Sequence, residues 1–461
     1  MAIEPAIFKS YDIRAIYPTQ LDEEGIAKIT QAIYKVISKK LGKEKIQIVL
    51  SRDMRISSPS LSESALQALL ACGIEVIDIG IASTPSMYFA VFHLKADGGM
   101  QISASHNPKE YNGIKIVMNT PDGLVKIGKT TGMEEVKNIS LQPAELLDLP
   151  PGKITKVDDI VKQEVENSLK IAGNPQIKEY KIVADAANSM GSVYLDELFK
   201  QIPGNLIRMN FELDGTFPSH QPDPLNFKTL VELQQRVKEE KADIGFAPDG
   251  DGDRFFFIDE LGQIVPPSII TSLVARELLK HNPGATILFD IRYILGPSKI
   301  IEENEGKYEV TKVGHAFITE KMHETGAIFA GESSSHFFYK EAGNGEAPMP
   351  VVLTVLSVMT RENKKLSELV EELRRSYESG EFNFKVTNSP EILEALKQKY
   401  SEGELNELDG IAISYPDWRL SVRTSNTEPL LRLNVEAYDK SIMEKHRDEL
   451  KAEIERLAKI N

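Results

Sequence analysis

The sequence predicts an α/β protein: three similar α/β/α domains with mixed sheets, plus a C-terminal α+β domain, arranged around a central cleft. Two observations lead to this fold class. The chain has 461 residues, well above the roughly 150 that are common for a single domain. The same succession of short apolar runs and helix-like segments also occurs three times along the chain, but not in its last part. We therefore expect domains over residues 1–150, 151–260, 261–370 and 371–461.

Each copy of the repeat contains three apolar runs with helix-like sequence between them. The first runs are IQIVL, YKIVADAA and ATILFD, and the second runs are IEVIDIG, NLIRMNF and YEVTKVG. The third runs, GGMQIS, ADIGFAP and GAIFAG, each end in a polar loop. Short strands that alternate with helices indicate parallel or mixed sheets with helices on both faces. Because ligands of such sheets bind beyond the carboxyl ends of strands, we expect the three loops to face one cleft.

The domain boundaries follow from composition. Residues 147–159 contain two adjacent prolines and charged residues, and we expect them to form a linker. Polar, helix-prone sequence over 361–376 separates the third copy from the remainder, and we expect an interdomain hinge near residues 360–375. That remainder contains the strand candidates IAISYP and LLRLNVEAY and closes with an amphipathic helix, which predicts an α+β domain.

Charge and cysteine content exclude several classes of protein. The formal net charge of −15 argues against a general nucleic-acid binder. Cys72 is the only cysteine, so neither an intramolecular disulfide nor a cysteine-based zinc site is available. The longest apolar stretch, residues 349–359, is too short to span a bilayer and is predicted to be a buried helix. We expect a cytoplasmic protein with no membrane partner.

Three aspartates at alternate positions follow the third run of the second copy. Asp249, Asp251 and Asp253 are separated by glycines, and three carboxylates this close together repel one another unless a cation binds them. Oxygen ligands of this kind favour Mg²⁺ or Ca²⁺. An EF-hand is excluded because Arg254 stands where that loop requires glycine and Phe255 begins a predicted buried strand.

The third run of the first copy leads into SASHNP, which contains Ser105 and His106. The flanking glycines of a hydrolase nucleophile elbow are absent, and a histidine adjacent in sequence is rarely placed to deprotonate its neighbour. Taken alone, this segment is typical of a turn. Beside a three-aspartate metal loop, however, a serine can carry a phosphoryl group whose oxygen the metal holds.

Two further polar loops have a composition that suits a sugar phosphate. GESSSH, residues 331–336, offers hydroxyls, a carboxylate and an imidazole for sugar hydroxyls. RTSNTEP, residues 423–429, combines an arginine with hydroxyl and amide groups, which favours a phosphate cradle. Either segment alone is equally typical of a polar turn.

Together these motifs resemble those of the α-D-phosphohexomutase superfamily. SASHNPKEYNGIK resembles its phosphoserine loop, DGDGDR its metal loop, GESSSH its sugar-binding loop and RTSNTEPLLR its phosphate-binding loop. FKSYDIRAIYP is similar to the N-terminal motif of the superfamily, and all five motifs occur in the expected order across nearly the whole chain. Within the superfamily, YDIR, the YNGIK ending and the chain length most resemble bacterial phosphomannomutase/phosphoglucomutase.

The resemblance implies reversible phosphoryl transfer between hexose 1-phosphate and hexose 6-phosphate, with mannose and/or glucose as the sugar, through phosphoserine and a hexose 1,6-bisphosphate. It implies Mg²⁺ as cofactor and glucose 1,6-bisphosphate or mannose 1,6-bisphosphate as activator. Because a four-domain cleft needs no partner subunit, we expect a monomer. The expected metal ligands are Asp249, Asp251, Asp253 and the phosphoryl group on Ser105. The expected catalytic residues are Ser105, His106, Arg14, Lys115 and His336. The expected substrate-binding residues are Tyr11, Arg254, Arg292, Gly314, His315, Glu332, Ser334, Arg423, Ser425, Asn426 and Thr427.

The sugar-binding loop departs from the pattern of the superfamily. Ser335 stands where glycine commonly precedes the histidine, and its Cβ could change the backbone angle and the preferred hexose. A phosphoglucosamine mutase is the alternative within the superfamily. A sugar-phosphate-binding protein without activity and a metal-dependent sugar phosphatase are the alternatives of other classes.

Overall fold

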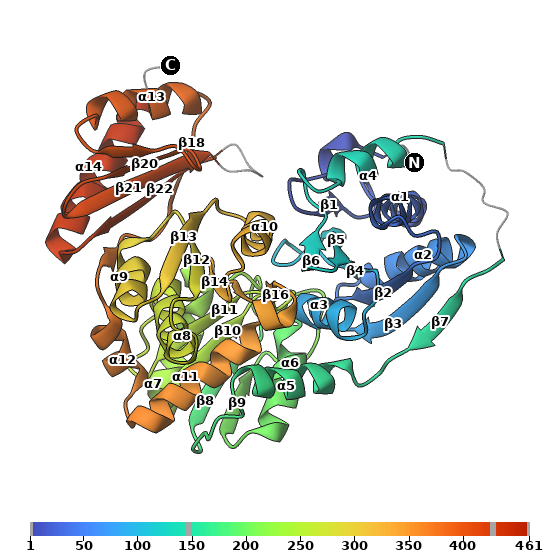
Figure 1. Ribbon diagram of the computed structural model, residues 1–461, viewed down its shortest axis with the longest axis horizontal. Coiled ribbons are helices and arrows are strands. Elements are labelled where there is room, and N and C mark those ends of the chain that lie inside the picture. Colours follow the sequence, from blue (N-terminus) through green and yellow to red (C-terminus); the bar gives the residue numbers. More distant parts are fainter. Residues whose placement is uncertain (1–2, 144–149, 425–429, 459–461) are drawn as a thin grey trace. The chain divides into compact units, whose positions relative to one another are not determined.

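The structure is a computed structural model that describes residues 3–143, 150–424 and 430–458. Its described residues form two compact units (Figure 1). One unit comprises residues 1–265 and 334–369, and the other comprises residues 266–333 and 370–461. Each unit is built from α/β layers, so the α/β fold class is confirmed. The predicted central cleft stays a prediction.

The first unit opens with a mixed sheet of seven strands in the order β1-β5-β4-β2-β3-β7, with β6 on β5. Strands β2, β3, β4 and β7 are parallel to one another, whereas β1 and β6 run antiparallel to β5 and β5 runs antiparallel to β4. The strands are β1 (Ile13–Ile16), β2 (Gln47–Arg52), β3 (Glu75–Ile81), β4 (Gly98–Ile102), β5 (Tyr111–Thr120), β6 (Gly123–Lys126) and β7 (Lys153–Lys156).

Helices cover both faces of this sheet, which explains why β4 is buried along its whole length. One hydrophobic cluster packs α1 (Glu23–Leu41), α2 (Ser58–Ala71) and α4 (Met133–Ser140) on one face. A second cluster packs α3 (Thr84–His93) and the start of α5 (Ile160–Ile171) on the other face. The short helix η1 (Pro5–Ile7) precedes β1.

A second sheet in the same unit has the strand order β11-β10-β8-β9. Strands β8, β9 and β10 are parallel, in agreement with the parallel or mixed sheet that the repeat predicts. Strand β11 runs antiparallel to β10. Its elements are β8 (Lys181–Asp185), α6 (Gly191–Gln201), β9 (Asn205–Met209), η2 (Phe227–Leu230), α7 (Val231–Glu240), β10 (Ile244–Pro248) and β11 (Phe255–Asp259). The unit also contains β15 (Phe337–Tyr339), η3 (Lys340–Ala342), β16 (Gly345–Glu346) and α11 (Pro348–Glu362).

The second unit contains the parallel strands β13-β12-β14 and a separate antiparallel sheet. The parallel part consists of α8 (Pro267–His281), β12 (Thr286–Asp290), α9 (Leu295–Glu303), β13 (Lys307–Thr311), α10 (His315–Thr325) and β14 (Phe329–Gly331). The antiparallel sheet has the order β17-β22-β21-β20-β19, with β18 on β22. Its elements are β17 (Tyr377–Glu378), β18 (Phe382–Lys385), α13 (Ser389–Lys399), β19 (Glu404–Asn406), β20 (Ile411–Ser414), β21 (Trp418–Thr424), β22 (Leu430–Ala437) and α14 (Lys440–Ala458).

Three sequence predictions about local structure can be compared with these elements. The apolar stretch at 349–359 lies in α11, a buried helix, as predicted. The linker predicted over 147–159 is wrong in part, because β7 lies within it and pairs with β3. All four residues of β7 are exposed, so the edge strand has no apolar pattern that would reveal it. Helix α12 (Leu366–Leu373) occupies the predicted hinge segment, and the hinge stays a prediction.

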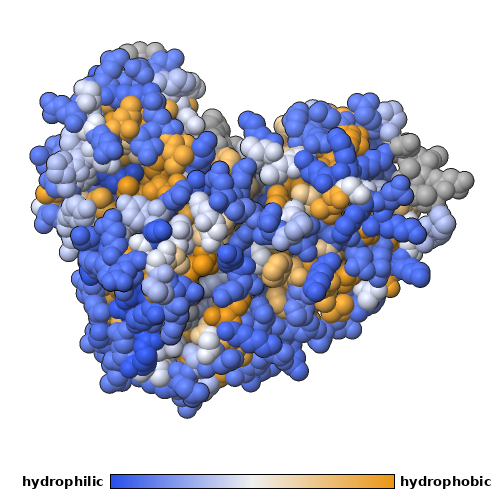
Figure 2. Space-filling model, viewed as in Figure 1, coloured by the Kyte–Doolittle hydropathy of each residue, from blue (hydrophilic) through white to orange (hydrophobic). Residues whose placement is uncertain are grey.

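The surface that Figure 2 presents is mostly hydrophilic, with hydrophobic residues among the hydrophilic ones. Within the described residues, no helix combines the length and the apolar character needed to cross a membrane.

Candidate active site

Ser105 lies in the loop between β4 and β5, in the first unit. Its side chain is buried and its backbone φ is +52°, a left-handed conformation that costs a non-glycine residue on the order of 1 kcal/mol. Its Oγ lies 3.1 Å from Oδ2 of Asp249 and 3.1 Å from Nδ1 of His106. The fold therefore brings the predicted nucleophile to the predicted metal loop across 144 positions of sequence.

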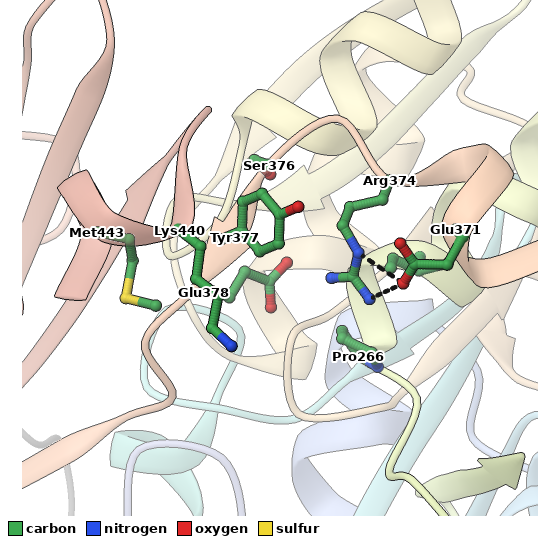
Figure 3. A pocket seen from close by; sticks show the side chains of 9 residues that line it. Pro266, Glu371, Arg374, Ser376, Tyr377, Glu378, Lys440 and Met443 are labelled. Atoms are coloured by element: carbon green, nitrogen blue, oxygen red, sulfur yellow. Dashed lines mark hydrogen bonds and ion pairs between the residues drawn. The ribbon is translucent and has the colours of Figure 1, made fainter. Parts of the chain in front are cut away.

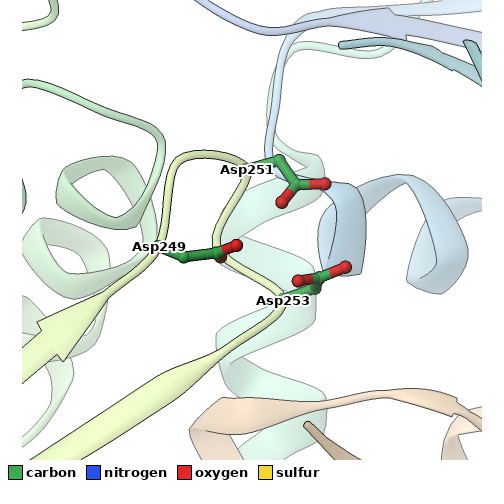
Figure 4. A group of neighbouring side chains, drawn as sticks. All are labelled: Asp249, Asp251 and Asp253. Carbon is green, nitrogen blue, oxygen red and sulfur yellow. The ribbon is translucent and has the colours of Figure 1, made fainter. Parts of the chain in front are cut away.

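The metal loop is the tight connection between β10 and β11. Asp249, Asp251 and Asp253 are all buried, and each offers a carboxylate oxygen within 4.8 Å of the others (Figure 4). Gly252 makes this turn possible because its φ is +78° and a Cβ there would lie 2.7 Å from the ring of Tyr194. The loop thus gathers three oxygen ligands at one point.

The charge of this group is partly balanced by Lys115 on β5. Its Nζ lies 2.5 Å from Oδ2 of Asp251 and 2.5 Å from Oδ2 of Asp253. Burial opposes the charge of Lys115, but the two aspartates outweigh it and raise the pKa of the ammonium group. Burial, followed by the charges of Asp253 and Asp251, raises the pKa of Asp249 to about 8. One lysine thus does not neutralise three carboxylates.

The residues of the loop fit a divalent cation. Oδ1 of Asp251 is buried and accepts no hydrogen bond from any described residue, whereas its Oδ2 receives Lys115 and Thr84. A buried carboxylate oxygen without a donor is costly, and a hard cation with oxygen ligands would remove that cost. The three carboxylates could therefore hold a metal ion.

Two further basic groups lie near the serine loop. Nε of Arg14, on β1, donates to Oδ2 of Asp12 over 2.8 Å, and its NH1 donates to Oδ1 of Asn107. Burial and then the charges of Arg254 and Arg14 lower the pKa of His106 well below its usual range, which favours the neutral imidazole. A neutral imidazole can accept a hydrogen bond from the serine hydroxyl.

His336 joins the site from the segment before β15. Its Nε2 lies 3.2 Å from Oδ1 of Asp253 and 3.3 Å from Nε of Arg254, and its Nδ1 lies 2.9 Å from Oγ of Ser334. Ser335 adopts a φ of +69°, so serine keeps the left-handed angle that glycine would favour here. Its hydroxyl donates to the carbonyl of Phe255 over 2.7 Å. The expected effect of Ser335 on the backbone angle and on the preferred hexose stays a prediction.

In the second unit, Arg292 and Glu332 lie close together. Arg292 donates twice to Asp290 over 2.9 Å, and its NH2 lies 3.6 Å from Oε1 of Glu332. Burial opposes the charge of Arg292, but Asp290 outweighs it and raises its pKa. The backbone N–H of Gly314 donates to Oε1 of Glu332 over 2.9 Å. These contacts place three predicted substrate-binding residues, Arg292, Gly314 and Glu332, in one cluster.

Arg423, at the end of β21, lies in the same unit beside an acidic residue that the sequence did not suggest. Its NH2 lies 3.2 Å from Oε2 of Glu381, whose Oε1 lies 3.2 Å from NH1 of Arg432. NH1 of Arg292 lies 3.7 Å from Oε2 of Glu381. Three arginines thus surround one carboxylate, and Asp290 and Glu332 also lie against Arg292. Ser425, Asn426 and Thr427 lie outside the described residues.

Tyr11 is half-buried before β1, and His315 is half-buried at the first position of α10. Sequence reasoning missed the polar and charged residues that hold the site in place: Asp53, Arg55, Thr84, Asp290 and Glu381. One signal was available, because Asp53 and Arg55 follow the first run of copy one with the spacing that Asp290 and Arg292 have in copy three.

A cavity of about 320 Å³ lies in the second unit and shares no lining residue with the predicted site (Figure 3). Arg374 and Lys440 contribute positive charge to its wall, and Arg374 is paired with Glu371. Burial, followed by the charge of Glu436, raises the pKa of Glu378 in this wall to about 8. The remaining lining residues are Pro266, Ile269, Ser376, Tyr377 and Met443.

Comparison with known proteins gives matches along the whole chain. Models of the phosphoglucomutase/phosphomannomutase family match residues 5–135 (α/β/α domain I), 160–262 (domain II), 266–377 (domain III) and 381–453 (C-terminal domain). A phosphomannomutase of Methanocaldococcus jannaschii is 37% identical over 454 residues, which cover 98% of each chain. A phosphomannomutase/phosphoglucomutase of Pseudomonas syringae pv. tomato is 33% identical, with 98% of this chain and 96% of the relative covered.

A solved structure of similar fold is that of a phosphoglucomutase/phosphomannomutase family protein from Burkholderia thailandensis. Its TM-score is 0.88 at 29% sequence identity, with 100% of this chain and 99% of the other covered. The ordered domains, with a serine beside an acidic loop, define the class of phosphohexomutases. The chain belongs to the phosphoglucomutase/phosphomannomutase family.

Proposed function

We propose that this enzyme moves a phosphoryl group reversibly between C1 and C6 of mannose and/or glucose, with phosphorylated Ser105 as the carrier and a hexose 1,6-bisphosphate as the intermediate. The observation that carries the proposal is the position of Ser105 Oγ, 3.1 Å from Oδ2 of Asp249 in a loop of three carboxylates. Such a pairing suits phosphoryl transfer, which depends on positioning and on neutralisation of charge.

The proposed metal is Mg²⁺, because all three ligands are hard oxygen atoms and Mg²⁺ is commonly bound by carboxylates together with a phosphate group. When bound, the ion would neutralise charge on the phosphoryl group. Lys115 and Arg14 provide fixed positive charge on the same unit. His106 Nδ1, 3.1 Å from the serine Oγ, can accept its hydrogen while the serine is unphosphorylated.

The opposite end of the substrate requires a second anchor, because the bisphosphate has to present either phosphate to Ser105. We assign this role to Arg423 and Arg292, which both lie against Glu381. Glu332 and Ser334 would bind sugar hydroxyls, and Ser425, Asn426 and Thr427 would complete the phosphate cradle. Glucose 1,6-bisphosphate or mannose 1,6-bisphosphate would restore phosphate to an empty serine. We expect the enzyme to work as a monomer.

The choice of hexose is part of the proposal. The relatives described above carry the names phosphomannomutase and phosphomannomutase/phosphoglucomutase, which supports mannose and glucose over glucosamine. Structures titled as N-acetylphosphoglucosamine mutase are similar in fold, with a TM-score of 0.60 at 13% identity. An inactive sugar-phosphate-binding protein is disfavoured because Ser105, Lys115 and the three aspartates are together in place.

The test is a set of coupled assays with mannose 1-phosphate, glucose 1-phosphate and glucosamine 1-phosphate, each with Mg²⁺ and a trace of glucose 1,6-bisphosphate. We expect mannose and glucose 1-phosphates to be converted to 6-phosphates by the wild type and not by Ser105→Ala. The matched control is Ser441→Ala, an exposed serine at the start of α14, which should keep wild-type rates. Release of inorganic phosphate in place of a hexose 6-phosphate would contradict the mutase proposal. Far faster turnover of glucosamine 1-phosphate would contradict the proposed specificity.

A further inference from the structure

The loop that carries Ser105 closes around a fully buried arginine. NH2 of Arg55 donates to the carbonyl oxygens of Ser105 and Asn107, each over 2.7 Å. Its NH1 donates to the carbonyl oxygens of Pro108 over 2.7 Å and Tyr111 over 3.0 Å. Four backbone carbonyls therefore converge on a single guanidinium group, and Arg55 is fully buried.

Asp53 holds the guanidinium from the other side. Its Oδ2 lies 3.1 Å from Nε of Arg55, and its Oδ1 accepts the backbone N–H of Arg55 over 3.0 Å. Counting this contact, all five N–H donors of the guanidinium are occupied. The ring of Phe217 lies 5.1 Å from the guanidinium carbon, which adds a cation–π contact.

The loop needs such support because its backbone is strained and its carbonyls point inward. Ser105 is held at a φ of +52° without the conformational freedom of glycine. Four carbonyl oxygens that converge in a buried space repel one another and lose their contacts with water. Each of them therefore needs a hydrogen-bond donor. A lysine could not replace the arginine, because its ammonium group has three donors at one point and no planar fork.

The spacing of Asp53 and Arg55 is repeated in the third copy of the fold, where Asp290 accepts the backbone N–H and the side chain of Arg292. There the guanidinium faces Glu332 and Glu381, whereas in the first copy it faces the serine loop. The same turn thus places an arginine beside two carboxylates in the third copy and an arginine against the serine loop in the first copy.

We propose that Arg55 is a positioning residue that holds the Ser105 loop in the conformation from which the hydroxyl can accept and return a phosphoryl group. The inference rests on the proposed function of Ser105. Arg55 touches no reacting atom: its donors reach the backbone of the loop, and its effect on Ser105 is exerted through that backbone. Loss of the guanidinium would leave the serine present but displaced, and a displacement of about 1 Å can lower a rate about 100-fold.

The experiment measures two properties of Arg55→Ala, Arg55→Lys and the wild type. The first is the rate at which glucose 1,6-bisphosphate adds a phosphoryl group to Ser105, followed by intact-mass spectrometry. The second is amide hydrogen exchange in residues 103–112, with strand β10 (Ile244–Pro248) as the internal reference. Arg208→Ala is the matched control, since Arg208 is half-exposed and pairs with Asp196.

We expect Ser105 in Arg55→Ala to be phosphorylated about 100-fold more slowly than in the wild type. Residues 103–112 of this variant should lose exchange protection, while β10 keeps its protection. Millimolar guanidinium ion should restore part of the rate by occupying the vacated space, whereas methylammonium and sodium ions should not. Arg55→Lys should remain slow although it keeps a positive charge.

Rates within about threefold of the wild type in both variants, with unchanged exchange in residues 103–112, would overturn the proposal. Global loss of protection in both variants would also overturn it, because Arg55 would then support the whole domain and not the loop. If the wild type itself takes up no phosphoryl group, the proposed function fails, and the exchange data alone decide the role of Arg55.

Discussion

The hydroxyl of Thr84 donates a hydrogen bond to Oδ2 of Asp251 over 2.5 Å, although 167 positions of sequence separate the two residues. The backbone N–H of Thr84 also donates to the backbone carbonyl of Asp251 over 2.9 Å. Both contacts come from the first turn of α3, so one helix end fixes the orientation of this carboxylate. Its Oδ2 is held by Thr84 and Lys115, and its Oδ1 is left for a cation.

Thr84→Val should therefore weaken the binding of Mg²⁺ or Mn²⁺ about 10-fold or more, as is usual when a residue that orients a metal ligand is removed. Calorimetric titration of the purified protein with Mn²⁺ measures this directly and needs no turnover. Thr84→Ser keeps the hydroxyl and serves as the control, with near wild-type affinity expected. Equal affinity in the valine and serine variants would contradict a role for the Thr84 hydroxyl.

Asp251→Asn should lower turnover by about 100-fold or more, because the loop would lose a charged ligand at its centre. Its far-UV circular dichroism should match that of the wild type, since the amide is nearly isosteric with the carboxylate. Asp448→Asn, on the exposed side of α14, changes a surface carboxylate and should leave activity unaltered. Near-normal turnover in Asp251→Asn would refute the metal assignment.

Glu164 on α5 makes stability depend on pH. It is fully buried, and burial raises its pKa from the ordinary 4.5 to about 8, with only the hydroxyl of Ser86 acting in the opposite direction. Between these two pH values the unfolded chain gives up the proton and the folded chain keeps it. Stability from this group is therefore present below pH 4.5 and is lost progressively up to about pH 8.

Glu164→Gln removes this dependence while keeping the shape of the side chain. In urea unfolding, the variant should be more stable than the wild type at pH 8.5, and the difference should shrink as the pH is lowered to 5.5. A difference that is the same at both pH values would show that Glu164 does not titrate over this range in the folded protein.

Ser335 combines a left-handed φ with a hydroxyl that donates to Phe255. Ser335→Ala keeps the backbone strain and loses the hydrogen bond, so it should be destabilised by about 1 kcal/mol. Ser335→Gly loses the same bond but relieves the strain, and its stability should lie closer to that of the wild type. Thermal unfolding of the two variants under identical conditions makes the comparison. A glycine variant less stable than the alanine variant would contradict the strain at this position.

The parts of the fold that the sequence predicts are those with a strong apolar signal. Strands β2, β8 and β12 are buried runs of β-branched residues that open the three copies, and β4 and β10 are buried throughout. Sequence reasoning also missed β5, although most of its residues are buried. Strand β19 (ELN) is exposed at all three positions and does not differ from a loop in composition, whereas β18 (FNFK) alternates half-buried phenylalanines with exposed polar residues over only four positions.

The site divides in a similar way. The three aspartates are visible in sequence because their spacing is unusual for a strand or a helix, and Ser105 becomes a candidate only beside them and through the resemblance to the superfamily. The residues that hold them are not visible, because Arg55 contacts a loop 50 positions away and Thr84 contacts one 167 positions away. An ordinary threonine or arginine acquires such a role only through the fold.

The central claim is that Ser105 carries the phosphoryl group, and intact-mass spectrometry tests it most directly. The purified enzyme is measured before and after incubation with glucose 1,6-bisphosphate and Mg²⁺, and Ser105→Ala is treated in parallel. The account predicts a mass increment of one phosphoryl group in the wild type, located on the Ser105 peptide and absent from Ser105→Ala. A wild-type protein with no increment under either condition, or the same increment in Ser105→Ala, would contradict it.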